Sequence, residues 1–161
     1  MPGSGRSFEI ARRLVQSGHE VQMITSNRNY KYNAKSLFSN EEGICVWWLP
    51  VMYSNNLPYI KRILSFVKYA FYAIVKGRKI KVDLVFATST PLTIAIPGVI
   101  LSKIKKVPFI FEIRDLWPQM PIAIGAVKSP ISKWLARRLE TWAYNYSDRI
   151  IGLSPGICDG I

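Results

Sequence analysis

Acidic side chains are scarce in this chain of 161 residues, which carries 10 Asp and Glu against 22 Lys and Arg. The resulting net charge of +12 is large for one small domain and favours an anionic partner. Nucleic acid, an acidic membrane surface and a phosphorylated substrate all fit, and composition does not choose among them. A hydrophobic content of 49% excludes a disordered polymer, and the length suits one domain with its own core.

Residues that bind metals are also few. The chain has one histidine, His19, in an apparent turn, and two cysteines, Cys45 and Cys158, that are far apart in the sequence. One histidine and two distant cysteines do not have the spacing of zinc ligands, so we expect no metal and no cofactor. Cys45 lies in an apolar run, which favours a reduced thiol in the core.

Long uninterrupted apolar runs are missing as well. Residues 84–102 carry no charge, but Pro91 and Pro97 divide them into a strand, a turn and a helix rather than one membrane span. The first residues do not read as a signal peptide, because no apolar segment follows a basic start. We therefore expect the protein in the cytoplasm.

Apolar periodicity predicts strands that alternate with helices along the whole chain. We expect helices at residues 6–16, 57–77, 92–105 and from 129 onward, and strands at 20–25, 44–49, 83–87, 108–113 and 149–153. Such alternation is typical of an α/β fold, a doubly wound, mostly parallel sheet with helices on both faces. Because no strand precedes the first helix, we expect the first, central strand of the sheet to be missing.

A glycine-containing loop, residues 2–7, comes before the first helix. Gly3 and Gly5 would let backbone amides approach an anion at the helix N-terminus, although a plain flexible terminus fits equally well. A dinucleotide fingerprint needs a third small residue where Phe8 stands, and an acidic residue where the second strand ends in Thr25 and Ser26. The sequence therefore excludes a nicotinamide site of that kind.

Residues 111–118 (FEIRDLWP) carry the densest polar chemistry in the chain. An apolar strand runs into Arg114 and Asp115, and α/β sheets bind ligands at the carboxyl ends of parallel strands. Arg114 could bind an anion there, and Asp115 could accept a proton. An internal ion pair of Arg114 with Glu112 or Asp115 is the structural alternative.

A long helix is predicted at residues 57–77. Between positions 60 and 82, a basic stretch that includes most of this helix has seven Lys and Arg and no acidic residue. A helical wheel puts the apolar residues of this helix on one face, and we expect that face to pack in the core. We expect the opposite face to meet an anionic membrane through Lys61, Arg62, Lys68, Tyr69, Tyr72 and Lys76. A solvated face and a nucleic-acid surface are the alternatives. No motif of a nucleic-acid-binding fold accompanies the stretch, so we expect no nucleic acid.

Several short motifs, in this order and spacing, resemble the N-terminal domain of family 4 glycosyltransferases, and more narrowly the WbuB-like group that makes bacterial surface polysaccharides. They are FEIRDLWP at 111–118 and GAVKSP at 125–130, with GSGRSFEIARRL at 3–14, GHEV at 18–21, ITS at 24–26, SDRI at 147–150 and LSPG at 153–156. The resemblance spans nearly the whole chain.

This resemblance implies a GT-B fold, in which an N-terminal Rossmann-like domain holds the acceptor and a second domain holds the nucleotide sugar. It implies a retaining, metal-independent transfer to a saccharide acceptor that is linked to a lipid, on the cytoplasmic face of the membrane. We expect residues 1–161 to be the acceptor-side domain, incomplete at both ends and inactive alone, because the donor-binding E-x7-E pattern is absent.

The residues selected for this activity are Asp115 as the catalytic, acceptor-orienting group and Arg114, Gly3, Gly5 and Ser154 as acceptor or anion contacts. Many family members carry a histidine where this chain has Arg114 and Asp115. A basic nucleic-acid-binding module and a non-catalytic, membrane-associated scaffold are the functions that compete with sugar transfer.

Overall fold

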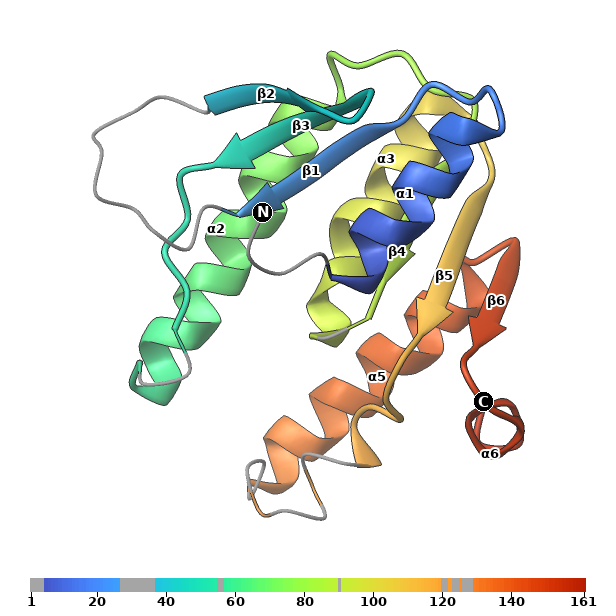
Figure 1. The fold of residues 1–161 in the computed structure, drawn as a ribbon. Coiled ribbons are helices and arrows are strands. Elements are labelled where there is room, and N and C mark those ends of the chain that lie inside the picture. The colour runs from blue at the N-terminus through green and yellow to red at the C-terminus, as the bar shows by residue number, and fades with distance from the viewer. Residues whose placement is uncertain are drawn as a thin grey trace. The chain divides into compact units, whose positions relative to one another are not determined.

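The computed structural model describes residues 5–26, 37–54, 57–89, 91–119, 122, 125 and 129–161. The chain divides into two compact units, Met1–Ile80 and Lys81–Ile161, and each has its own sheet. The elements of the first unit are α1 (Arg6–Gln16), β1 (Gln22–Ser26), β2 (Leu37–Glu41), β3 (Ile44–Leu49) and α2 (Tyr59–Gly77). Those of the second are β4 (Val85–Thr88), the 3₁₀ turn η1 (Leu92–Ile94), α3 (Ala95–Lys105), β5 (Phe109–Ile113), α5 (Pro130–Asn145), β6 (Arg149–Gly152) and α6 (Pro155–Cys158) (Figure 1).

In the first unit, β3 is the central strand of three, in the order β1-β3-β2. It pairs in parallel with β1 and antiparallel with β2. Glu42 and Gly43, both with positive φ, make the tight turn between β2 and β3. The sequence interpretation had no strand between residues 26 and 43, and β2 corrects it. Backbone hydrogen bonds to β3 form this strand, and an edge strand needs no apolar run to make them.

The two faces of this sheet are covered by different helices. Ile44 and Val46 of β3 are buried in one apolar cluster with Ala11 of α1. Leu49 is an odd number of residues from Ile44 and Val46 along β3, so its side chain points to the other face of the sheet. It is buried in another cluster with Ala73 of α2. Because side chains alternate across a strand, β3 presents one apolar face to each helix. This is the doubly wound arrangement that the alternating pattern predicts.

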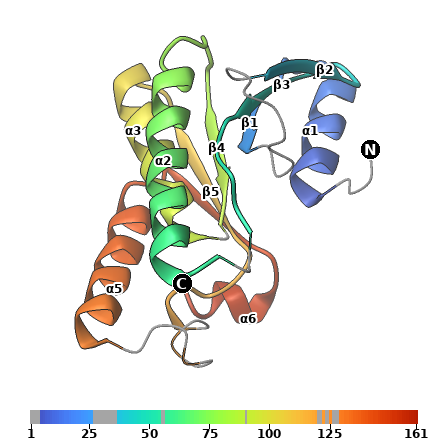
Figure 2. The same ribbon diagram turned by 90° about the vertical axis from the view of Figure 1, so that its left-hand side faces the viewer.

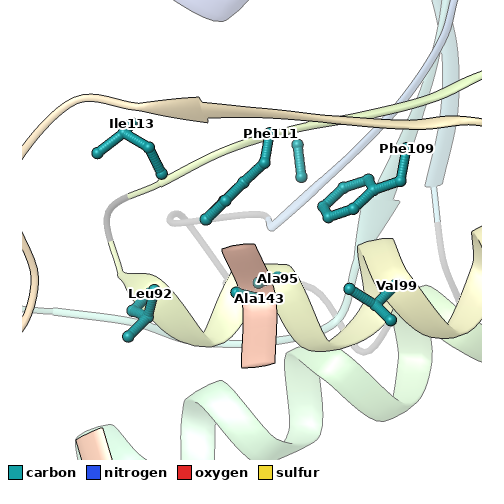
Figure 3. Close-up of a cluster of buried hydrophobic side chains, with 8 residues drawn as sticks. Leu92, Ala95, Val99, Phe109, Phe111, Ile113 and Ala143 are labelled. Carbon is teal, nitrogen blue, oxygen red and sulfur yellow. The ribbon is translucent and has the colours of Figure 1, made fainter. Parts of the chain in front are cut away.

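The second unit contains a fully parallel sheet in the order β4-β5-β6. Figure 3 shows its core, where side chains from one face of β5 point toward α3. Phe109, Phe111 and Ile113 of β5 are almost completely buried. The other members of the cluster are Ala87, Leu92, Ala95, Val99 and Ala143, which come from β4, η1, α3 and α5. The apolar run at residues 84–102 is therefore a strand, a turn and a helix, as predicted.

The predicted α/β class with a mostly parallel sheet is confirmed, with the strands divided between two sheets. Within the described residues, β1 and β4 each lie at an edge of their own sheet. The expectation that a central strand is missing from the sheet is not tested by this pairing, and it stays a prediction. None of the helices in the described ranges is long and apolar enough to cross a membrane.

Candidate acceptor site

The carboxyl ends of β4, β5 and β6 lie at one edge of the parallel sheet, because the register pairs Thr88 with Glu112 and Ile113 with Gly152. Ser89 follows β4, while Arg114 and Asp115 follow β5. Ser154 follows β6 in the same way. The structure therefore brings three residues selected from the sequence, Arg114, Asp115 and Ser154, to the edge where such sheets bind ligands. Figure 2 shows this unit from a second direction.

Ser89 fixes the peptide from which Arg114 and Asp115 extend. Its backbone N–H donates to the Glu112 carbonyl oxygen at 2.8 Å, and its Oγ accepts the Arg114 backbone N–H at 2.9 Å. The Ser89 side chain is 2% exposed. Together the two hydrogen bonds extend the pairing of β4 with β5 beyond the last strand residues. The Arg114 side chain is exposed beyond this fixed point, and Asp115 is half-buried.

Glu112 is a buried carboxylate at the same edge that the sequence interpretation did not select as a site residue. It is 1% exposed, and its Oε2 accepts a 2.6 Å hydrogen bond from the Thr88 hydroxyl. Thr88 and Glu112 are register partners on neighbouring parallel strands. The sequence does carry a signal for this pair, because each of two successive apolar strands has a polar residue in its last positions. Parallel pairing puts such residues side by side.

The segment after Asp115 is anchored to the rest of its unit. The Leu116 side chain contacts Gly160 so closely that a Cβ on that glycine would lie 2.7 Å from a Leu116 methyl carbon. Trp117 packs against the core cluster, and Pro118, joined to it by a cis peptide, is fully buried. Arg114 and Asp115 therefore stand between two fixed points, the bond to Ser89 and this apolar anchor.

A polar contact from α5 continues this anchor. Glu140 of α5 forms side-chain hydrogen bonds with Gln119 and with the Tyr144 hydroxyl. Partial burial raises the pKa of Glu140, and the hydrogen bonds oppose that shift. Burial and the neighbouring Glu140 together raise the pKa of Tyr144 to about 12. Tyr144 is thus a neutral hydrogen-bond donor at physiological pH.

The other predicted acceptor contacts have local structural roles or lie outside the described residues. Ser154 is the N-cap of α6, and its Oγ accepts the Ile157 N–H at 3.3 Å. Gly5 is the N-cap of α1 in the first unit, and its carbonyl accepts the Phe8 N–H at 2.8 Å. A Cβ on Gly5 would meet nothing within 4 Å. Gly3 lies outside the described residues. Anion binding by these three residues stays a prediction.

The residues expected to face a membrane differ in their contacts, and their membrane role stays a prediction. The Tyr69 hydroxyl donates a 2.9 Å hydrogen bond to the Ile24 carbonyl, and burial raises the pKa of Tyr69 to about 12. The Lys76 Nζ lies 3.1 Å from the centre of the Trp47 ring. Desolvation and the neighbouring Lys79 lower the pKa of Lys76. Arg62 is half-buried, whereas Lys61, Lys68 and Tyr72 are exposed.

Parallel strands covered by helices, with polar side chains at the carboxyl ends of the strands, define a Rossmann-like α/β domain, and sheets of this kind generally bind their ligands at that end. Residues 4–161 match the glycosyl transferase 4-like domain, and the chain belongs to this glycosyltransferase family. No curated protein matches the sequence.

Proposed function

We propose that this domain binds the acceptor in a retaining, metal-independent transfer of a sugar from a nucleotide sugar. The acceptor is a lipid-linked saccharide at the cytoplasmic face of the cell membrane, and the product is a cell-surface polysaccharide such as O-antigen or capsule. Similarity to the WbuB-like group supports this narrower assignment. The donor nucleotide binds mainly to a second domain in a fold of this type.

The observation that carries this proposal is the position of Arg114 and Asp115. Both follow β5 at the carboxyl edge of the parallel sheet, between the hydrogen bond to Ser89 and the anchor formed by partly buried Trp117 and buried Pro118. A carboxylate held in this way can orient an acceptor hydroxyl or accept its proton. The hydroxyl oxygen then forms the new glycosidic bond as the nucleoside diphosphate leaves. The exposed Arg114 guanidinium can hold an acceptor phosphate.

The test is Asp115→Asn in a form of the protein that transfers sugar. The change keeps the size of the side chain and removes its charge and basicity. A positioned acid or base contributes roughly 10²–10⁴-fold in rate, so turnover should fall by such a factor while the melting temperature barely changes. Turnover with a saturating acceptor and thermal unfolding should both be measured on the same preparation.

Asp83→Asn is the matched control, because Asp83 is an exposed carboxylate that precedes β4 at the opposite edge of the same sheet. It should keep the wild-type turnover. A structural role for Asp115 gives the reverse pattern, a lower melting temperature with normal turnover per folded molecule. A destabilised but fully active Asp115→Asn variant would therefore remove Asp115 from the reaction.

A further inference from the structure

The hydroxyl of Ser89 takes the place that a backbone carbonyl has in a regular parallel sheet. Because the register pairs Thr88 with Glu112, a continued ladder would pair Ser89 with Ile113. The Ser89 N–H would then donate to the carbonyl of Glu112, and the Ser89 carbonyl would accept the N–H of Arg114. The first bond is present at 2.8 Å, but the Arg114 N–H donates to Ser89 Oγ instead, at 2.9 Å.

This exchange lets β4 end earlier than its neighbour β5. The last residue of β4 is Thr88, and the chain then passes through Pro91 into η1. The end of β5 still has a cross-strand hydrogen bond at Arg114, and Asp115 follows directly. Ser89 thus holds the end of β5 at the edge where such sheets bind ligands, although its own strand has already ended.

The backbone has no ready substitute for this hydroxyl. Leu92 and Ala95, which follow in η1 and α3, are 3% and 0% exposed and belong to the core cluster (Figure 3). Pro91 comes just before them and restricts the backbone. A carbonyl at position 89 could join the ladder only by pulling this packed segment toward β5. Without the hydroxyl, the Arg114 N–H therefore loses its acceptor, and the peptide that leads to Asp115 can shift.

We propose that Ser89 is a positioning residue for sugar transfer, which acts through the Arg114 peptide to keep the Asp115 carboxylate directed at the acceptor hydroxyl. In this role Ser89 touches no reacting atom, and its hydroxyl fixes the direction in which the strand end leaves the sheet. A displacement of about 1 Å at a reacting group can cost roughly 10²-fold in rate. The inference rests on the proposed function, because it needs Asp115 to take part in the reaction.

Ser102 offers a matched control in the same unit. Its side chain is also buried, and its Oγ donates a 2.6 Å hydrogen bond to the Val107 carbonyl. Val107 precedes β5, so this bond lies at the opposite edge of the sheet from Arg114. Ser89→Ala and Ser102→Ala each remove one hydroxyl and one hydrogen bond, and both should lower the melting temperature of the second unit by about 4–8 °C.

Turnover separates the two serines when it is measured per folded molecule, in a form of the protein that transfers sugar. Ser89→Ala should lower kcat roughly 10–100-fold, whereas Ser102→Ala should keep the wild-type value. A wild-type kcat in Ser89→Ala would overturn the proposal. An equal loss in both serine variants would do so too, because the cause would then be a general loss of rigidity.

A double-mutant cycle tests whether Ser89 acts through Asp115. In the Asp115→Asn background, Ser89→Ala should lower kcat by less than about twofold, because the group that Ser89 positions no longer takes part in catalysis. If Ser89 acts on the reaction by another route, its loss gives the same factor in both backgrounds. An undiminished loss of kcat in the double variant would therefore contradict the proposal.

The Arg114 amide reports the hydrogen bond itself and requires no sugar transfer. In nuclear magnetic resonance spectra of the chain, this amide should exchange its hydrogen roughly tenfold faster in Ser89→Ala than in the wild type. The same amide should exchange at the wild-type rate in Ser102→Ala. An unchanged rate in Ser89→Ala would refute the proposal, because the peptide would then be held without the hydroxyl.

Failure of the proposed function gives a different pattern from failure of this inference. If Asp115→Asn keeps the wild-type kcat, Asp115 has no part in the reaction, and the proposed function fails together with the positioning role. If Asp115→Asn lowers kcat as expected and Ser89→Ala does not, the proposed function stands and only the positioning role of Ser89 fails.

Discussion

Tyr69 ties helix α2 to strand β1 through one hydroxyl group. Its hydrogen bond to the Ile24 carbonyl measures 2.9 Å, and burial raises the pKa of Tyr69 from 10.0 to about 12. A raised pKa means that folding favours the neutral phenol. The corresponding stability is fully present below pH 10 and is lost as the pH rises from 10 through about 12.

Replacing Tyr69 by Phe should therefore have two effects. At neutral pH it should lower the free energy of unfolding by about 1 kcal/mol, because the hydrogen bond is lost. It should also flatten the fall in stability between pH 10 and 12, the interval set by the shift of the Tyr69 pKa. Chemical denaturation across this pH range measures both.

Tyr72→Phe is the control for Tyr69→Phe. Tyr72 is 37% exposed on the same helix, so its hydroxyl should stay hydrated and its loss should barely change stability at neutral pH. Equal destabilisation by the two changes would contradict the assignment of Tyr69 as the inward-facing tyrosine.

The sequence predicts the strand-end residues of the site more easily than their surroundings. Arg114 and Asp115 could be located because a parallel sheet puts the end of every apolar strand at the ligand edge. The hydrogen bond from Arg114 to Ser89 could not be predicted, because it joins residues 25 positions apart and depends on the register of β4 with β5. The burial of Glu112 depends on the same register.

At the scale of elements, helix α3 packs closely against strand β5 at the position of Gly98. A Cβ on Gly98 would lie 2.5 Å from Cε2 and 2.7 Å from Cζ of the Phe109 ring. Phe109 is 0% exposed and stacks on Phe111, so its ring has no room to move. Gly98 thus sets how closely the helix packs on the strand, because any side chain there would push the two apart.

The substitution Gly98→Ala should lower the free energy of unfolding by about 1–3 kcal/mol through overpacking. Gly156→Ala in α6 is the matched control, since a Cβ there meets nothing within 4 Å. It should leave stability unchanged or raise it by up to about 1 kcal/mol, because alanine favours helix more than glycine does. Thermal or chemical unfolding measures both, and a stabilised Gly98→Ala would contradict the close approach.

The helix α2 shows what periodicity predicts and what it does not. Apolar spacing correctly predicts a long helix and groups Ile60, Leu64, Val67 and Phe71 on one side. It does not say which side faces the sheet of its own unit: Tyr69 and Lys76, on the side of the wheel opposite these four residues, contact β1 and β3. Specific partners on other elements, Ile24 and Trp47, decide the rotation, and no local pattern in α2 encodes them.

At the scale of the whole molecule, the apolar contacts collect in separate clusters. The cluster around Phe109 and Phe111 belongs to the second unit, whereas those around Ile44 and Leu49 belong to the first. The two sheets share no strand pairing among the described residues. Cooperative unfolding needs a shared core, and chains whose parts have separate cores commonly depart from two-state behaviour.

We therefore expect two unfolding transitions in the chain, one for each unit. Tyr69→Phe should shift only the transition of the first unit, and Gly98→Ala only that of the second, because each changed contact lies within one unit. Hydrogen exchange followed by mass spectrometry on peptides from residues 44–49 and 109–113 assigns the transitions, since these strands form the two cores. A single transition that both substitutions shift, with the two strands losing protection together, would show that the units fold as one and that the separate clusters do not act as separate cores.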